Sequence, residues 1–213
     1  MALLDNLPSG ATAAYGLSKL LDSYVGSACR VRRSSDSVET DIGFDANGYL
    51  DVATLASFQG VAAETTLVTL YDQTGNGNHA TQSSASAQPL IGLYSGGSFS
   101  MASIHPVSGR YGINFNGAEF LDAPNIYSIS NFSALSIFTS NAVNLTEQFL
   151  YNLSTGGADA VGFDMNRNVA GIVIIRHDLG TPDFSVSETG LVQGQPAIVT
   201  DFMNGTSLST TAY

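Results

Sequence analysis

Tryptophan is absent from this chain of 213 residues, and cysteine occurs once, at Cys29. A lone cysteine excludes an internal disulfide and a cysteine-based zinc site. Basic residues are also scarce: seven Lys and Arg stand against 18 Asp and Glu, and the formal net charge is -11. We therefore expect no binding to nucleic acid, which relies on Lys and Arg to neutralise phosphate, and no docking on an anionic membrane.

Long apolar runs are missing as well. No stretch approaches the roughly 20 apolar residues that a membrane-spanning helix needs, so we expect no membrane insertion. The first ten residues, MALLDNLPSG, contain neither a basic region nor an apolar core, so we expect no secretory signal. The three histidines, at positions 79, 105 and 177, are scattered and show no metal-ligand spacing.

Alternating apolar and polar residues predict β-strands over much of the chain. Charged residues make up only 12% of the sequence, so the polar surface is mostly Ser, Thr, Asn and Gln, which suits strands joined by turns. Strands are predicted at 111–115, 161–165 and 184–187 from their period of two, and at 67–71, 172–175 and 197–203 from denser apolar runs. Asn-Gly pairs at 47–48, 76–77, 116–117 and 204–205 favour tight reversals. The pattern predicts an all-β sandwich or jelly roll.

Two short helices near the N-terminus are the exceptions. Apolar residues at 17, 20, 21 and 24 have helical spacing and predict a helix over 14–24. Asp51 is placed to cap a second helix through Phe58, with Gly60 as its stop. Residues 1–12 are rich in Gly, Pro and Ala and are expected to form an arm. Residues 13–213 show no composition break, so we expect them to form one domain.

The segment Tyr71-Asp72-Gln73-Thr74-Gly75-Asn76-Gly77-Asn78-His79 is the most distinctive motif. Its aspartate is expected to fix a turn by accepting backbone N–H groups, its glycines supply unusual backbone angles, and its histidine closes the loop. Three interpretations remain open: a structural turn, a sugar-contacting loop, or a calcium loop, for which the oxygen ligands are few and mostly neutral. The candidate ligand-binding residues are Asp72, Gln73, Asn76, Asn78 and His79. No other metal or cofactor is expected.

A basic cluster precedes this motif. In a strand, Arg30 and Arg32 would share one face, with Val31 and Arg33 on the other. One interpretation is a structural salt-bridge network with the aspartates at 36, 41 or 72. The other makes Arg30 and Arg32 an anchor for an acidic saccharide or for a partner's carboxylates.

Two stretches carry a family resemblance: residues 30–36 leading to 41–44, and residues 70–82. Together they resemble a concanavalin-A-like, laminin-G-like module of tailed-phage virion proteins and bacterial surface proteins. The element Y-D-Q-T-G-N-G-N is also similar to one in the catalytic domain of fungal α-L-arabinofuranosidases. The resemblance extends over about 14–123, and it implies a concanavalin-A-like antiparallel sandwich without specifying the ligand.

An arabinofuranosidase of this kind would need two carboxylates flanking the glycosidic bond, about 5–5.5 Å apart in a retaining mechanism. The resemblance implies a nucleophilic Glu on a strand of the second half, where the nearest position by pattern is Asp164. An Asp there is one methylene shorter. The partner acid lies later in those enzymes, where only Asp201 is available, and their paired cysteines have no counterpart. These departures favour a protein that is not an enzyme.

We therefore predict a non-catalytic phage virion structural or attachment protein, of the tail-fibre, spike or head-decoration type, with host surface carbohydrate as a candidate ligand. It would be made in the host cytoplasm and located in the virion. Expected partners are other virion proteins and further copies of the chain. Thr200–Thr211 predicts a strand, a reversal and the start of another strand, so either the last strand comes from elsewhere or the sheet ends on an exposed edge that can pair with another chain. The alternative is a carbohydrate-active enzyme of the arabinofuranosidase type, or its non-catalytic carbohydrate-binding module.

Overall fold

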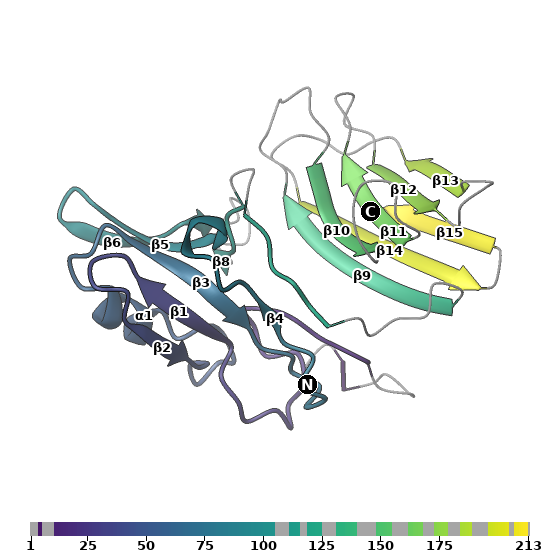
Figure 1. Ribbon diagram of the computed structural model, residues 1–213. Helices are drawn as coiled ribbons and strands as arrows, with labels where there is room; N and C mark the ends of the chain where they lie inside the picture. Colours follow the sequence, from purple (N-terminus) through teal and green to yellow (C-terminus); the bar gives the residue numbers. More distant parts are fainter. Residues whose placement is uncertain are drawn as a thin grey trace. The chain divides into compact units, whose positions relative to one another are not determined.

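A computed structural model describes residues 4–5, 11–104, 111–115 and 119–124, together with the backbone of the strands between 131 and 212 (Figure 1). The chain divides into two compact units, 1–126 and 127–213, and each is described by itself. Most of the expected arm, residues 1–12, lies outside the described residues. The division into an arm and one domain of residues 13–213 stays a prediction.

The first unit is an antiparallel sheet with one α-helix on one of its faces. Its elements are β1 (Cys29–Arg33), β2 (Glu39–Ile42), α1 (Val52–Gln59), β3 (Glu64–Leu70), β4 (Ala80–Thr81), the 3-10 turn η1 (Ala85–Ala87), β5 (Leu90–Ser95), β6 (Ser98–Met101), β7 (Ser103–Ile104) and β8 (Tyr111–Gly112). The sheet order is β2-β1-β3-β5-β6, and β4 pairs with the end of β3. β7 and β8 pair with each other.

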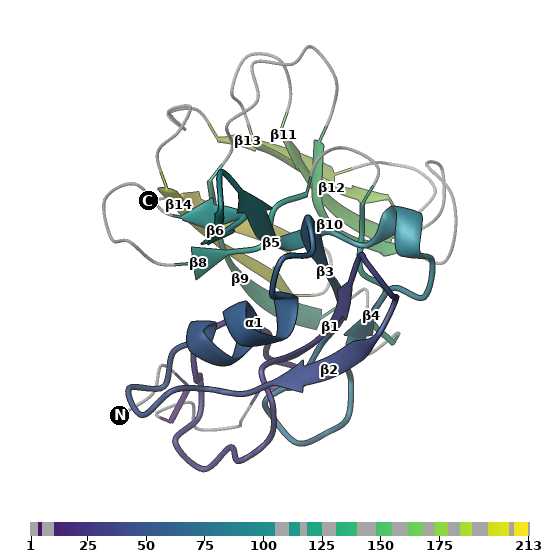
Figure 2. The same cartoon turned by 90° about the vertical axis from the view of Figure 1, so that its left-hand side faces the viewer.

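The core of this unit lies between the sheet and α1 (Figure 2). In β1, Cys29 and Val31 are fully buried, whereas the residues between and after them are only partly buried. α1 contributes Leu55, which is also fully buried. The alternation that the sequence predicts for this strand is therefore confirmed, and it places Arg30 and Arg32 on the outer face of the sheet.

The second unit is also antiparallel. Its strands are β9 (Asn131–Thr139), β10 (Gln148–Ser154), β11 (Gly162–Arg167), β12 (Val173–Asp178), β13 (Phe184–Glu188), β14 (Pro196–Asn204) and β15 (Ser207–Ala212). They form a four-stranded sheet, β10-β11-β12-β13, and a three-stranded sheet, β15-β14-β9. β13 lies beside β15. The described part of the chain contains no helix with the length and hydropathy of a membrane span.

The all-β, antiparallel fold class is confirmed, and so are most of the individual strands. β3, β11, β12, β13 and β14 each coincide with a predicted strand, although Val161 and Ile172 lie outside the described residues. The reversal at 204–205 joins β14 to β15, which pair antiparallel. The Asn-Gly pair at 116–117 lies outside the described residues. The strand expected over 111–115 shrinks to β8 and one bridge, with Tyr111 and Phe115 exposed.

Of the two predicted helices, one is confirmed and one is wrong. Asp51 caps α1 by accepting the N–H of Thr54, and the N–H of Gly60 closes its last turn. Residues 14–24 form no helix. Their backbone groups bond to distant parts of the chain instead: Lys19 donates to Gly48, and Leu50 donates to Leu17. These bonds replace the intrahelical ones, so helical spacing alone did not decide the structure.

Candidate functional site

The distinctive motif forms a loop, residues 71–79, between β3 and β4 at one end of the first sheet. We call it the Asp72 corner. β4 returns antiparallel along β3, with Leu70 paired to Ala80, so the corner is the turn of a hairpin. Gly75 and Gly77 have φ angles of 84° and 78°, which residues with a side chain rarely adopt. The predicted role of these glycines is confirmed.

Asp72 is the hub of this corner, and it is 1% exposed. Its carboxylate accepts the backbone N–H groups of Ala14 (2.9 Å), Thr74 (3.0 Å) and Asn78 (3.2 Å), as well as the Thr74 hydroxyl (2.8 Å). Burial by itself would raise the pKa of Asp72. The hydrogen bonds from Thr74, Ala14 and Asn78 outweigh burial and hold this pKa below its ordinary value.

The other polar side chains of the corner bind an N-terminal segment, residues 11–20. The Gln73 amide donates to the carbonyls of Gly16 and Ser18, both at 3.0 Å, and accepts the N–H of Leu20 at 2.8 Å. Asn76 and Asn78 both donate to the carbonyl of Thr12, at 3.0 and 2.9 Å. The Tyr15 hydroxyl donates to the carbonyl of Asn78. These bonds fix residues 11–20 of the same chain against the Asp72 corner, and we call this set of bonds the clamp.

His79 closes the loop, as the sequence predicts. Its Nδ1 accepts the backbone N–H of Asp72 at 3.1 Å. Because a ring nitrogen that accepts a hydrogen bond carries no proton, the imidazole proton lies on Nε2. The ring of Tyr71 meets the imidazole edge-on, with ring centroids 5.0 Å apart. The structural interpretation of the motif thus accounts for each of its polar residues.

The ligand-binding role proposed for Asp72, Gln73, Asn76, Asn78 and His79 stays a prediction. Asp72 and Gln73 are each 1% exposed and already bonded to the chain. Among the described residues, no group of three or more His, Cys, Asp or Glu is arranged to hold a metal ion. The carboxylate of Asp72 and the amide of Gln73 thus already have internal partners, which accounts for these two residues without a ligand.

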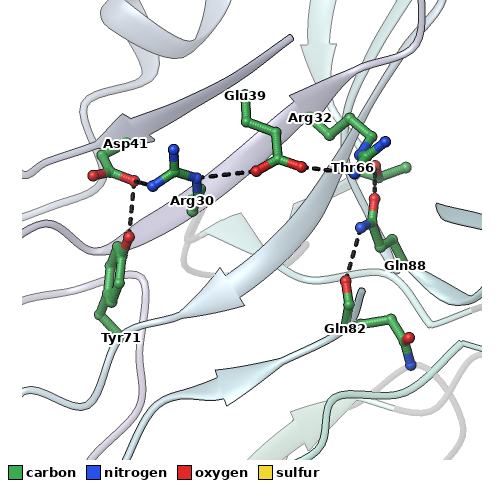
Figure 3. A network of polar contacts seen from close by, with 8 residues as sticks. All are labelled: Arg30, Arg32, Glu39, Asp41, Thr66, Tyr71, Gln82 and Gln88. Carbon is green, nitrogen blue, oxygen red and sulfur yellow. Dashed lines mark hydrogen bonds and ion pairs between the residues drawn. The ribbon is translucent and has the colours of Figure 1, made fainter. Parts of the chain in front are cut away.

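The outer face of the sheet carries a second polar network, running from Tyr71 across β2 and β1 (Figure 3). Arg30 contacts Glu39 at 3.1 Å through Nε and Asp41 at 3.4 Å through Nη1. Arg32 contacts the other oxygen of Glu39 at 2.7 Å. The Tyr71 hydroxyl donates to Asp41 at 2.8 Å. These ion pairs fit the salt-bridge interpretation of the basic cluster.

Arg33 lies on the opposite side and ties β1 to α1. It pairs with Asp36 at 2.6 Å, donates to the carbonyl of Phe58 at 2.6 Å and covers the Phe58 ring. Asp36 and Asp41 were expected as partners, whereas Asp72 pairs with no arginine of the described residues. Sequence reasoning missed Glu39. The alternation of Glu39 and Asp41 around Thr40 mirrors that of the arginines and could have identified it.

Asp164, the candidate nucleophile, lies on β11 in the middle of the four-stranded sheet. In the strand register it stands opposite Asn152 of β10 on one side and Arg176 of β12 on the other. Opposite residues share a face of the sheet, and so do residues two apart on one strand. Asp178 therefore shares this face, one step diagonally from Asp164.

Comparison with known proteins bears on the first unit in particular. The family model described as "Alpha-L-arabinofuranosidase B, catalytic" matches residues 6–114. A curated relative, the probable alpha-L-arabinofuranosidase B of Aspergillus flavus, is 44% identical over 84 residues, which cover 37% of this chain and 16% of that protein. The predicted resemblance to arabinofuranosidases is confirmed. The phage module finds no support in these comparisons.

Solved structures of GH54 α-L-arabinofuranosidases share the β-sandwich fold over the whole chain. One was soaked with a cyclic sulfate inhibitor and has a TM-score of 0.69 at 15% identity. A mutant soaked with 4-nitrophenyl α-L-arabinofuranoside has a TM-score of 0.70 at 16% identity. An arabinofuranosidase complexed with arabinofuranosyl-α-1,2-xylobiose has a TM-score of 0.67 at 15% identity. The chain spans half the length of each of these proteins.

These matches overturn the predicted function. A non-catalytic phage virion structural or attachment protein is wrong, and so is its location in the virion, because both the family model and the curated relative are arabinofuranosidases. The expectation that the protein is not an enzyme is wrong for the same reason. The missing cysteines and the shorter side chain of Asp164 therefore do not exclude the chain from this family.

Proposed function

We propose that this chain, which belongs to the family of the alpha-L-arabinofuranosidase B catalytic domain, is a glycoside hydrolase domain that cleaves terminal α-L-arabinofuranosyl groups. The observation that carries the proposal is the family match over residues 6–114, more than half of the chain. The fold shared with the solved arabinofuranosidases, and the 44% identity to the fungal relative, support it.

The chemistry requires two carboxylates, one as a nucleophile or base and the other as the acid that protonates the leaving oxygen. We assign the first role to Asp164. In the strand register it stands between Asn152 of β10 and Arg176 of β12, on a central strand of the four-stranded sheet.

Asp178 is the candidate for the second carboxylate. It lies diagonally across the β11–β12 pair from Asp164, and diagonal neighbours have Cα atoms about 7–8 Å apart. Asp201, the other residue considered for this role, belongs to β14 of the three-stranded sheet and is paired there with Ala134 and Thr210.

Release of 4-nitrophenol from 4-nitrophenyl α-L-arabinofuranoside tests the proposal with the whole chain. We expect turnover by the wild type, and a loss of about 10³-fold or more in kcat for Asp164→Asn and Asp178→Asn. Asp36→Asn, which changes a carboxylate bound to Arg33 on the first unit, is the matched control and should keep wild-type turnover. A well-folded wild type without turnover would contradict the proposal, and full turnover by Asp164→Asn would contradict its assignment as nucleophile.

A further inference from the structure

The outer face of the first sheet presents a continuous row of fixed polar groups. We call it the Arg30 face; its members are Tyr71, Asp41, Arg30, Glu39 and Arg32 (Figure 3). Each neighbouring pair in this row is joined by a hydrogen bond or an ion pair of 2.7–3.4 Å. The row crosses β2 and β1 and ends beside β3. Four of its five side chains therefore belong to β-strands, which fix their positions.

The members of the row are held in place, yet they keep unused hydrogen-bonding capacity. Arg30 has five N–H donors, and its side chain, 42% exposed, uses Nε for Glu39, Nη1 for Asp41 and one further interaction with the Tyr71 hydroxyl. Asp41 receives the hydrogen bond from Tyr71 and the contact from Arg30 on Oδ1, and among the residues drawn in Figure 3 no dashed line reaches its other oxygen. Its side chain is 44% exposed. A fixed donor and a fixed acceptor therefore stand side by side on an open surface.

The charge balance of this face indicates what kind of ligand it suits. Two arginines are paired with two carboxylates, so the face is close to neutral. An acidic saccharide, one of the partners expected for Arg30 and Arg32 from the sequence, would have to compete with Glu39 and Asp41. A sugar hydroxyl does not compete in this way, because it accepts from an arginine and donates to a carboxylate at once.

We propose that the Arg30 face is a contact surface for a neutral, hydroxyl-rich polysaccharide, the kind of chain that carries arabinofuranosyl branches. The inference rests on the proposed function for the identity of the polysaccharide. The Arg30 face belongs to the first unit, whereas Asp164 belongs to the second. Pairs of adjacent hydroxyls bridge Arg30 and Asp41, and the Tyr71 ring, held edge-on by His79, adds apolar contact. Because its donors and acceptors are already fixed, the face loses little side-chain entropy on binding.

Affinity electrophoresis in native gels containing soluble arabinoxylan tests this surface, with gels containing polygalacturonate and gels without polymer run in parallel. We expect arabinoxylan alone to slow the wild type. Arg30→Ala should weaken the binding about tenfold, as expected for loss of hydrogen bonds to a charged group. Tyr71→Phe removes the hydroxyl that fixes Asp41 and should weaken it less.

The controls separate binding from folding. Asp41→Asn should weaken binding, whereas Asp36→Asn, at a carboxylate of similar exposure outside the face, should not. Arg30→Lys keeps the charge without the planar fork and replaces Arg30→Ala if that variant does not fold. The proposal is overturned if arabinoxylan does not slow the wild type, or if it slows the variants of the Arg30 face as much as the wild type. It is also overturned if polygalacturonate slows the wild type more strongly than arabinoxylan does.

The outcome is distinguishable from that of the proposed function. A chain that is slowed by arabinoxylan, with the expected effects of the variants, but does not cleave the aryl arabinofuranoside supports this surface and refutes the hydrolase. A chain that cleaves the aryl arabinofuranoside but is not slowed refutes this surface and supports the hydrolase.

Discussion

Replacing Asp72 with Asn should strongly destabilise the first unit, although the two side chains have nearly the same shape. The new amide has one oxygen, which can keep the N–H groups of Ala14 and Thr74, but its NH₂ then faces the N–H of Asn78. Losing the charge costs about 1 kcal/mol at each retained bond, and the unsatisfied N–H costs about 1–3 kcal/mol. We expect a total loss of about 3–5 kcal/mol.

Urea unfolding followed by far-UV circular dichroism and tyrosine fluorescence measures this loss, since the chain has no tryptophan. Amide hydrogen exchange at Ala14 and Thr74 reports on the corner itself. Asp45→Asn is the matched control: Asp45 accepts the N–H groups of Asn47 and Tyr49 in an exposed turn, so we expect a loss of about 1 kcal/mol or less. A loss below about 1 kcal/mol for Asp72→Asn would refute the clamp as a source of stability.

The pH dependence of the same variant gives an independent check. The pKa of Asp72 is lowered in the folded chain, so its contribution to stability is present above the ordinary, unfolded-state pKa and disappears as the pH falls through the folded-state value. Asp72→Asn carries no such group, so its stability should fall less steeply with acid than that of the wild type. Parallel acid profiles of the two proteins would count against this assignment.

Three further predictions concern the core. Gly92→Ala should lower the free energy of unfolding in urea by about 1–3 kcal/mol, because the added Cβ would lie 2.3 Å from Gln59 Oε1. Gly43→Ala is its control: no atom lies within 4 Å of the added Cβ, so the free energy of unfolding should change by no more than about 0.5 kcal/mol. Cys29 should react with Ellman's reagent only after unfolding, since burial and then Asp41 raise its pKa to about 12. Burial also raises the pKa of Tyr15 to about 12. The unfolded chain therefore loses the protons of Tyr15 and Cys29 at a lower pH than the folded chain, so the urea midpoint of unfolding should fall as the pH rises above about 9. An unchanged midpoint would contradict this prediction.

Local chemistry explains why one helix could be predicted and the other could not. α1 begins at a side-chain cap and ends at a glycine a few residues later, so everything that bounds it is visible within one short window. The residues around Leu17 have helical spacing too. Their backbone partners, however, are supplied by Gln73 and Gly48, which lie far along the chain and which no local pattern reveals.

The same contrast holds for the candidate site. The turn fixed by Asp72 follows from an aspartate two residues before an N–H donor, and the positive φ angles follow from the glycines. That Asn76 and Asn78 bind the carbonyl of Thr12 rather than a ligand depends on contacts across more than 60 residues. The period of two predicts that Arg30 and Arg32 share a face, and the same period in β2 places Glu39 and Asp41 on one face, but which carboxylate meets which arginine follows from the register of β1 and β2.

The clamp on residues 11–20 also dictates an order of events during synthesis. Ala14 leaves the ribosome 58 residues before Asp72, its hydrogen-bond acceptor. At about 5–20 residues per second, the segment waits roughly 3–12 s before its binding site exists. During that interval the apolar residues of this segment have no place to dock, so we expect chaperones to engage it before Asp72 is synthesised.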